Sequence, residues 1–179
     1  MGCAGVGQQK LVEVPTHKFS YKEPPPDWER VFSENTDVEV GDVKIPAYSV
    51  SWLNSRSSSI TILAVDLSDH PNKPTKREAT IWGIEDWINE SLKNACSATR
   101  FTILEEENGT YKDSVEVFKL TSEVNCESSE GGDDLITRLN SQVIDFMGIR
   151  YRFQFSSLSQ AYDEDYKIFA EFLESIGFI

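Results

Sequence analysis

The clearest strand pattern in this chain is Gly148-Ile149-Arg150-Tyr151-Arg152-Phe153-Gln154-Phe155-Ser156. Its three aromatic residues alternate with Arg150, Arg152 and Gln154, so the two sets lie on opposite faces of an extended backbone. Such alternation is typical of a strand with one face in the core. The stretch therefore predicts a strand over 149–156 with one aromatic face.

Two segments, one before and one after this strand, have helical periodicity. The earlier stripe indicates a helix at roughly 81–96, and it consists of Ile84, Trp87, Ile88, Ser91, Leu92 and Ala95. The later stripe indicates a helix that stops at Gly177, and it consists of Tyr162, Tyr166, Phe169, Leu173 and Ile176. Each helix has one apolar stripe, so each is expected to cover a sheet.

Further strands account for much of the remaining chain. Residues 60–67 are apolar at nearly every position, which favours a central strand covered on both faces. Alternation over 48–52 predicts a half-buried strand before it. Asn108-Gly109 is a type I′ turn signal between expected strands at 99–105 and 111–124, and another strand is expected at 135–146.

The order of these elements favours an α+β domain with a mostly antiparallel β-sheet covered by two main helices. The strands follow one another too closely for repeated parallel crossovers. Small residues near the start and the stiff Pro24-Pro25-Pro26 run predict a tether over residues 1–26. The single globular domain is then expected at 27–179.

This layout resembles the PsbP-like family, which includes a photosystem II oxygen-evolving accessory subunit and a Ran-GTPase-binding nuclear import factor. The resemblance covers residues 19–177 and rests on the order of elements, without a diagnostic motif. It is carried by Pro26-Asp27-Trp28, the mid-chain helix, the Asn108-Gly109 hairpin, the 148–153 strand and the closing 166–176 helix. It implies an α/β/α sandwich and a non-enzymatic binding or assembly role.

The first residues, Met1-Gly2-Cys3-Ala4, resemble the end of a bacterial lipoprotein signal, where the cysteine becomes the lipidated first residue of the mature chain. Position 4 is Ala rather than Asp, which in a diderm bacterium resembles the pattern of lipoproteins that are sorted to the outer membrane. Two alternatives remain open. One is myristoylation of Gly2 with palmitoylation of Cys3, which Val6 disfavours because Ser or Thr is usual there, and the other is an incidental cysteine. The lipoprotein interpretation predicts a lipid-anchored protein of the bacterial cell envelope, at the outer membrane or the cell surface.

The other two cysteines depend on that interpretation. If Cys3 carries the lipid, Cys96 and Cys126 are an even pair in an oxidising compartment. A disulfide between them would close a loop of about 30 residues and contribute roughly 3 kcal/mol. The alternative is two separate thiols, with Cys96 in the last turn of the mid-chain helix. Neither has a second Cys or His at ligand spacing, so no metal site is predicted.

The charge balance argues against two classes of partner, nucleic acid and anionic lipid surfaces. The chain has 17 basic and 30 acidic residues, a net charge of −13, and 16 of the acids lie after residue 100. Binding to nucleic acid or to an anionic lipid surface relies on clustered cations, so neither is expected as a direct partner. The lipid on Cys3 is therefore the expected route to a membrane.

Common catalytic and cofactor-binding motifs are absent from the sequence, and we expect no enzyme activity, cofactor or metal. His70 lies near Asp66 and Asp69, but a loop histidine without a spaced partner is typical of a solvated residue. The acidic runs at 105–107 and 163–165 fit an exposed hairpin edge and a helix start, respectively.

Two of the four tryptophans, Trp28 and Trp82, flank predicted elements and would form a surface groove if they were exposed together. The leading hypothesis is a non-enzymatic, lipid-anchored, extracytoplasmic lipoprotein that binds a protein or an envelope component. One alternative is a cytosolic regulatory binding protein of the Ran-binding type. The other is a carboxylate-based hydrolase whose acids and aromatic side chains assemble across the fold.

Overall fold

The computed structural model describes residues 9–40, 43–70, 72–92, 94–112, 114–128 and 133–179. Its elements are β1 (Leu11–Val14), η1 (Pro15–His17), β2 (Phe19–Lys22), β3 (Trp28–Val40), β4 (Val43–Asn54), β5 (Ser59–Asp66), α1 (Lys76–Ser91), β6 (Cys96–Tyr111), β7 (Val115–Ser128), β8 (Leu135–Phe146), β9 (Ile149–Leu158), α2 (Tyr162–Ser175) and β10 (Gly177–Phe178). Neither α-helix in these ranges has the length and hydropathy of a membrane span.

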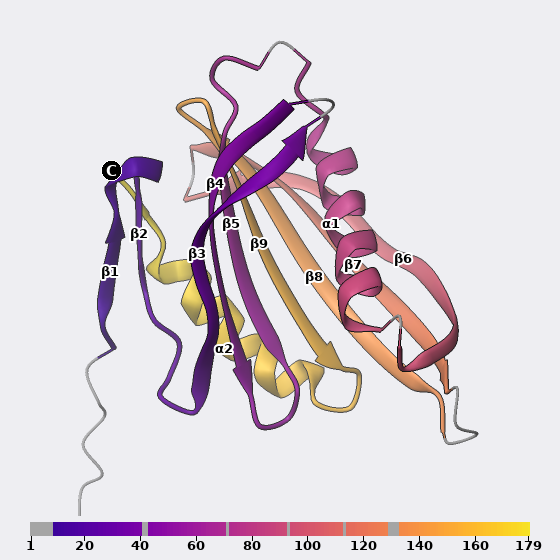
Figure 1. Ribbon diagram of the computed structural model, residues 1–179. Helices are drawn as coiled ribbons and strands as arrows, with labels where there is room; N and C mark the ends of the chain where they lie inside the picture. The colour runs from indigo at the N-terminus through magenta and orange to yellow at the C-terminus, as the bar shows by residue number, and fades with distance from the viewer. Residues whose placement is uncertain (1–8, 41–42, 71, 93, 113, 129–132) are drawn as a thin grey trace, which may run out of the picture.

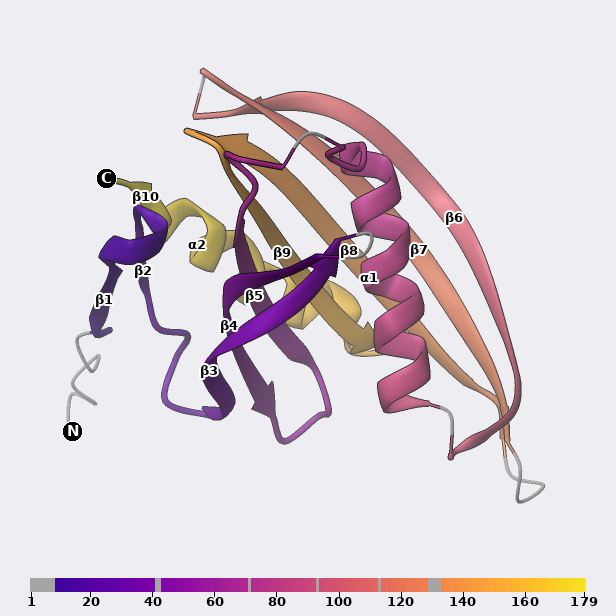
Figure 2. The ribbon, with the colours of Figure 1, turned by 45° about the horizontal axis from the view of Figure 1, so that its top comes forward.

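A seven-stranded sheet forms the middle layer, in the order β3-β4-β5-β9-β8-β7-β6 (Figure 1). Its neighbouring strands are paired antiparallel. The helices α1 and α2 lie on opposite faces of this sheet (Figures 1 and 2). The predicted α+β class, an antiparallel sheet between two helices, is confirmed. The strands expected at 60–67 and 135–146 are β5 and β8, and β5 lies inside the sheet, as its apolar run predicts.

The strand β9 has the two faces that its alternation predicts. Tyr151, Phe153 and Phe155 are buried on the α2 side. There Phe155 stacks on Phe169 of α2, with ring centroids 5.4 Å apart. A fully buried side chain of this size contributes about 1.5–3 kcal/mol, so this aromatic layer strongly stabilises the contact between the sheet and α2.

The helix predicted at 81–96 is found at Lys76–Ser91, because a capping box sets its start. The Glu78 N–H donates to Thr75 Oγ1 at 3.1 Å, and the Thr75 N–H donates to the Glu78 carboxylate at 2.7 Å. These bonds satisfy backbone groups that the first turn leaves unpaired. On the sheet side of the helix, Ile84 is fully buried in a cluster with Phe118, Leu120, Val124 and Leu139.

The N-terminal segment belongs to the domain, so the predicted tether over residues 1–26 and the boundary at residue 27 are wrong where the structure describes this segment. β1 and β2 form a small antiparallel sheet with β10 from the far end of the chain. Phe19 and Tyr21 are fully buried in the α2-side core. Burial of these rings outweighs the local flexibility that the composition suggests. Cys3 lies outside the described residues.

The long hairpin of β6 and β7 turns later than Asn108-Gly109 predicts. Both residues are paired inside the ladder, and β6 continues to Tyr111. The Tyr111 hydroxyl donates to the Leu173 carbonyl at 2.6 Å, and its ring packs edge-on against Phe178. Tertiary contacts with the C-terminal segment therefore override the local turn signal.

Candidate functional site

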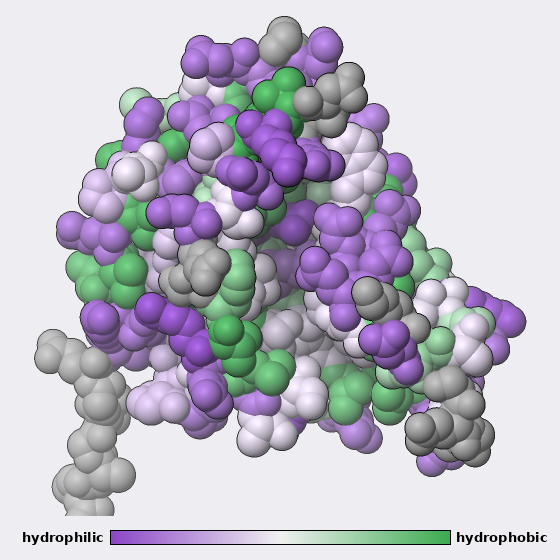
Figure 3. All heavy atoms as spheres, in the orientation of Figure 1, coloured by the Kyte–Doolittle hydropathy of each residue, from purple (hydrophilic) through white to green (hydrophobic). Residues whose placement is uncertain are grey.

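A cleft of 560 Å³ lies on the α1 side of the sheet, between α1 and the outer half of the β3–β4 hairpin. We call it the α1 cleft. β5 and β9 supply its floor. Figure 2 shows the hairpin tip reaching towards α1, and Figure 3 shows a hollow between the two, next to polar side chains. The cleft exists because α1 covers only part of this face of the sheet.

Apolar packing holds the hairpin over the floor. Ile45 and Ala47 of β4 are buried against Val65 and Leu67, and Val38 of β3 packs on the same cluster. This cluster positions the neighbouring β3 side chains Asp37 and Glu39 along the wall of the cleft.

The helix α1 presents two different faces. One face packs on β7 and β8 through Ile84 and its neighbours. The other faces the cleft at helical spacing, and it consists of Ala79, Trp82, Gly83, Asp86 and Glu90. Because helical residues three and four apart share a face, one helix serves both as a core element and as a cleft wall.

Arg152 rises from β9 and lies under this second face. A Cβ on residue 83 would overlap its guanidinium, so any larger residue there would require the arginine side chain to move. Its Nη1 donates to the Ala79 carbonyl at 3.4 Å, a long bond. Its Nε is buried and has no hydrogen-bond partner among the described residues. The guanidinium therefore lies against Gly83 with unused donors.

Nearby carboxylates influence Arg152 without pairing with it. Burial lowers the pKa of the Arg152 guanidinium, and the negative charges of Asp86 and Glu90 oppose this shift. Within the described part of the chain, no carboxylate lies at ion-pair distance from it. Arginine keeps its charge even when buried, so a cation without a direct counterion faces the cleft.

Arg150, two residues before it on the same strand, is fully used by the fold. Its Nε and Nη2 donate to the two carboxylate oxygens of Asp145 at 2.7 and 2.8 Å. Its Nη1 donates to the Pro74 carbonyl at 2.6 Å, next to the start of α1. Arg150 therefore anchors the helix, whereas Arg152 is left with donors to offer.

A second depression of 690 Å³ lies on the opposite face of the sheet, and we call it the α2-side groove. It runs beside Tyr162 and Tyr166 of α2 and over the polar face of β6, β7 and β8. Its two cationic side chains have partners: Lys119 meets the Glu107 carboxylate at 2.7 Å, and Arg138 lies over the Tyr162 ring at 5.1 Å. Both cations of this groove have a carboxylate partner, since Arg138 also lies 3.6 Å from Glu123, although its Nε is buried without a hydrogen-bond partner among the described residues.

The predicted groove of Trp28 and Trp82 is wrong. Trp28 begins β3 and is only 5% exposed, packed into the α2-side core, whereas Trp82 on α1 is 49% exposed beside the α1 cleft. The two residues belong to different surfaces because β3 starts at one end of the molecule and α1 covers the other face of the sheet. Only Trp82 contributes to the candidate site.

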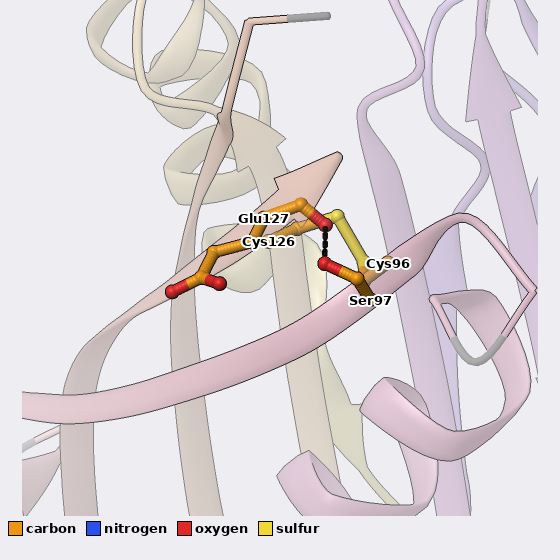
Figure 4. The surroundings of a disulfide bond; sticks show 4 residues. All are labelled: Cys96, Ser97, Cys126 and Glu127. Carbon is orange, nitrogen blue, oxygen red and sulfur yellow. Dashed lines mark hydrogen bonds between the residues drawn. A yellow bond between two sulfur atoms is a disulfide. The ribbon is translucent and has the colours of Figure 1, made fainter. Parts of the chain in front are cut away.

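Cys96 and Cys126 are joined by a disulfide with a Cα–Cα distance of 5.3 Å (Figure 4). Cys96 begins β6, so its expected position in the last turn of the helix is wrong. The bond joins the two strands of the long hairpin near their open end, where the Ser97 hydroxyl also donates to the Glu127 carbonyl at 3.2 Å. It therefore holds the outermost strand of the sheet to its neighbour.

The histidines and the acidic runs do not assemble into a metal centre. Among the described residues, no three or more His, Cys, Asp or Glu side chains are arranged to hold an ion. His17 is buried, which lowers its pKa. Of the acidic runs, Glu106 pairs with Arg77 at 2.8 Å and Asp165 is buried in a hydrogen-bond network at the start of α2.

The fold matches that of solved structures. The solution structure of the cyanobacterial PsbP protein CyanoP from Synechocystis matches with a TM-score of 0.63 over 100% of this chain and 98% of that one, at 13% identity. The fold is PsbP-like. The Ran-binding protein Mog1p from Saccharomyces cerevisiae matches with a TM-score of 0.50 over 96% and 95% of the two chains, at 14% identity. No family model and no curated protein matches the sequence.

Sequence reasoning missed Arg152 as the residue at the centre of the candidate site. The alternation of residues 149–156 predicts only that Arg152 lies on the polar face of the strand, opposite the aromatic residues. An isolated Gly83 inside a helix was the available signal, because such a glycine often marks close approach by another group. The structure shows that the approaching group is the Arg152 guanidinium.

Proposed function

We propose that this chain is a non-catalytic extracytoplasmic binding module, held at the cell envelope by a lipid on Cys3, whose α1 cleft receives a protein or envelope component. The observation that carries the proposal is the guanidinium of Arg152 in that cleft. Burying a charged group without a partner is unfavourable for folding. Groups that are unfavourable for folding are expected at sites where a protein binds a ligand.

The rest of the cleft suits a protein partner. Trp82 is half exposed at the cleft, and Trp and Arg are the residues most enriched among those that dominate binding energy. The outer wall is the β3–β4 hairpin, which is fixed by its own apolar cluster. A preformed site of this kind loses little conformational entropy on binding.

The disulfide supports the extracytoplasmic part of the proposal. Disulfides persist in oxidising compartments and are rare in the cytosol. The Cys96–Cys126 bond therefore favours an exported chain over a cytosolic regulatory binder, and the proposed lipid on Cys3 is consistent with export. The lipid would supply membrane attachment that a net charge of −13 disfavours on anionic lipid.

The state of the carboxyl groups supports a non-catalytic role. A carboxylic acid that serves as a general acid needs a raised pKa. Three carboxyl groups of this chain are shifted in the opposite direction: the Arg77 guanidinium lowers the pKa of Glu106, hydrogen bonds from Thr75 lower that of Glu78, and hydrogen bonds from Ser68 lower that of Asp66. These groups serve ion pairing and capping.

Intact-mass analysis of the protein purified from its native host tests the anchor. We expect a diacylglyceryl-modified Cys3 as the first residue and a mass consistent with one disulfide. Alkylation before and after reduction locates that bond. An unmodified Cys3 with Met1 and Gly2 retained, together with free Cys96 and Cys126, would overturn the envelope assignment and favour the cytosolic alternative.

A pull-down from native membranes tests the cleft. The lipidated protein is compared with Arg152→Met and with Arg138→Gln, a matched change in the α2-side groove. We expect Arg152→Met to lose its captured partners and Arg138→Gln to keep them. A Cys3→Ser variant separates partners held through the cleft from those held through the membrane. Capture that is unchanged in Arg152→Met would contradict the cleft as the binding site.

A further inference from the structure

We propose that the α1 cleft binds the C-terminal end of a basic peptide segment, with Arg152 pairing to the free carboxylate and the acidic walls receiving lysine or arginine side chains. This inference rests on the proposed function and names the ligand class of the same site. It follows from three features: the unused donors of Arg152, the charge on the two walls, and the size of the cleft.

The donors point to a carboxylate. A guanidinium presents its N–H groups in a planar fork that matches the two oxygens of a carboxylate. Arg150 shows the geometry within this chain, since it grips both oxygens of Asp145. Arg152 has the same fork, held against Gly83, but its single bond is the long one to the Ala79 carbonyl. A carboxylate ligand would complete it.

The walls require that the same ligand also carry positive charge. Asp37 and Glu39 lie on one wall and Asp86 and Glu90 on the other. Of these four, only Glu39 has an ion-pair partner among the described residues, Lys44 at 3.9 Å, and both side chains are well exposed. A small inorganic anion would meet four like charges on its way to one arginine. A peptide with cationic side chains and a free C-terminal carboxylate complements both the acidic walls and Arg152.

The size and the aromatic wall favour a chain end over a long segment. The volume of 560 Å³ lies within the range of about 300–1,000 Å³ of sites that enclose small ligands, so it suits a few residues. Arg152 lies on the floor beneath α1, where a terminus can enter and stop. Trp82 lines the same cleft, where its ring can pack on the stem of a lysine or arginine.

Titrations of the full chain with synthetic peptides test the proposal by calorimetry and by shifts of backbone NMR signals. The probes are the tripeptide Gly-Lys-Lys as a free acid, the same peptide with an amidated C-terminus, and the free acid Gly-Gln-Gln. We expect the first to bind best. Loss of either the carboxylate or the two cationic side chains should weaken binding about tenfold or more, the effect of one charge-assisted hydrogen bond.

Substitutions test which residues bind the carboxylate of the peptide and which bind its lysine side chains. Arg152→Met should weaken the free acid about tenfold or more and leave the amide unchanged, because only the free acid uses the guanidinium fork. Asp86→Asn combined with Glu90→Gln should weaken both lysine peptides. Glu85→Gln, an equally exposed change on α1 outside the cleft, is the control and should change neither.

Two results would overturn the inference. One is equal binding of the free acid and the amide, with no effect of Arg152→Met. The other is absence of binding by all three peptides up to millimolar concentration. If the pull-down still depends on Arg152 in that case, the cleft remains the binding site and only the ligand class is wrong. If neither depends on Arg152, the proposed function fails as well.

Discussion

The α1 cleft and the α2-side groove lie on opposite faces of one sheet, and they differ in how their polar groups are satisfied. At the start of α2, the buried Asp165 carboxylate accepts from Asn54 at 3.1 Å and from Ser58 at 2.5 Å, and pairs with Arg56. On the other face, Arg152 has one long hydrogen bond. Each helix covers part of one face, so depressions arise on both. Among the described residues, Arg152 in the α1 cleft has no carboxylate at ion-pair distance, whereas Arg138 in the α2-side groove has Glu123 at 3.6 Å. An open depression is therefore weaker evidence of a binding site than an unsatisfied group inside one.

The largest effect is expected on the α2 side, from Asp165→Asn. This change replaces one of the two carboxylate oxygens, which accept from Ser58, Asn54 and Arg56, by an NH2 donor. Of the two carboxylates that pair with Arg56, only Glu164 then remains. The free energy of unfolding should fall by about 3 kcal/mol, as for other broken buried pairs. Urea denaturation monitored by circular dichroism measures it. Asp163→Asn, an exposed neighbour in the same turn, should stay within about 0.5 kcal/mol of the unmodified chain.

Gly83→Ala should have the next largest effect, and on the α1 side. Alanine favours a helix by about 1 kcal/mol over glycine, but its Cβ would overlap the Arg152 guanidinium. The net destabilisation should be about 1–2 kcal/mol, as for overpacking. In an Arg152→Ala background the same change should become stabilising. A double-mutant cycle that shows no coupling between residues 83 and 152 would contradict the close packing of these two groups.

Arg152→Met should leave stability unchanged or raise it by about 1 kcal/mol, because it removes a buried charge that lacks a partner. This is the opposite sign from Asp165→Asn, and it sharpens the contrast between the two faces. Thermal unfolding of the two variants side by side measures it. A loss of more than about 2 kcal/mol would show that Arg152 is needed for folding, which would remove the main support for the proposed site.

The smallest effect is expected from the pH dependence of His17. Burial lowers its pKa in the folded state below its usual 6.5, although Asp66 opposes the shift. The unfolded chain therefore binds a proton more readily. The stability from neutral His17 is full above pH 6.5 and is lost as the pH falls through the lowered folded-state value. Denaturation between pH 8 and pH 5 should show a weaker decline in His17→Gln, and identical slopes would show that His17 is not the cause.

Much of the architecture could be predicted where one residue pattern dominates. The alternation of β9, the apolar run of β5 and the stripe of α2 each correspond to an element in the structure. The errors have physical causes of the same kind. The prediction of a tether is wrong because Phe19 and Tyr21 are buried by residues distant in sequence. The prediction of a turn at Asn108-Gly109 is wrong because Tyr111 is held by a hydrogen bond to the C-terminal segment.

The candidate site was hidden for the same reason. Nothing local distinguishes Arg150 from Arg152, since both alternate with aromatic residues on one strand. Their different roles depend on what stands opposite them: Asp145 and the start of α1 for the first, Gly83 for the second. The pairing of Cys96 with Cys126 likewise depends on the register of β6 against β7.

The sequence by itself determined the fold class and the orientation of its most regular strands and helix stripes, because these depend on the 2.0 and 3.6 residue periods of the backbone. It also determined the net charge of −13, from which we predict that nucleic acid is not a direct partner. Only the tertiary structure decided which polar residues are satisfied. That property belongs to pairs of groups brought together from different elements, and no single stretch of sequence contains it.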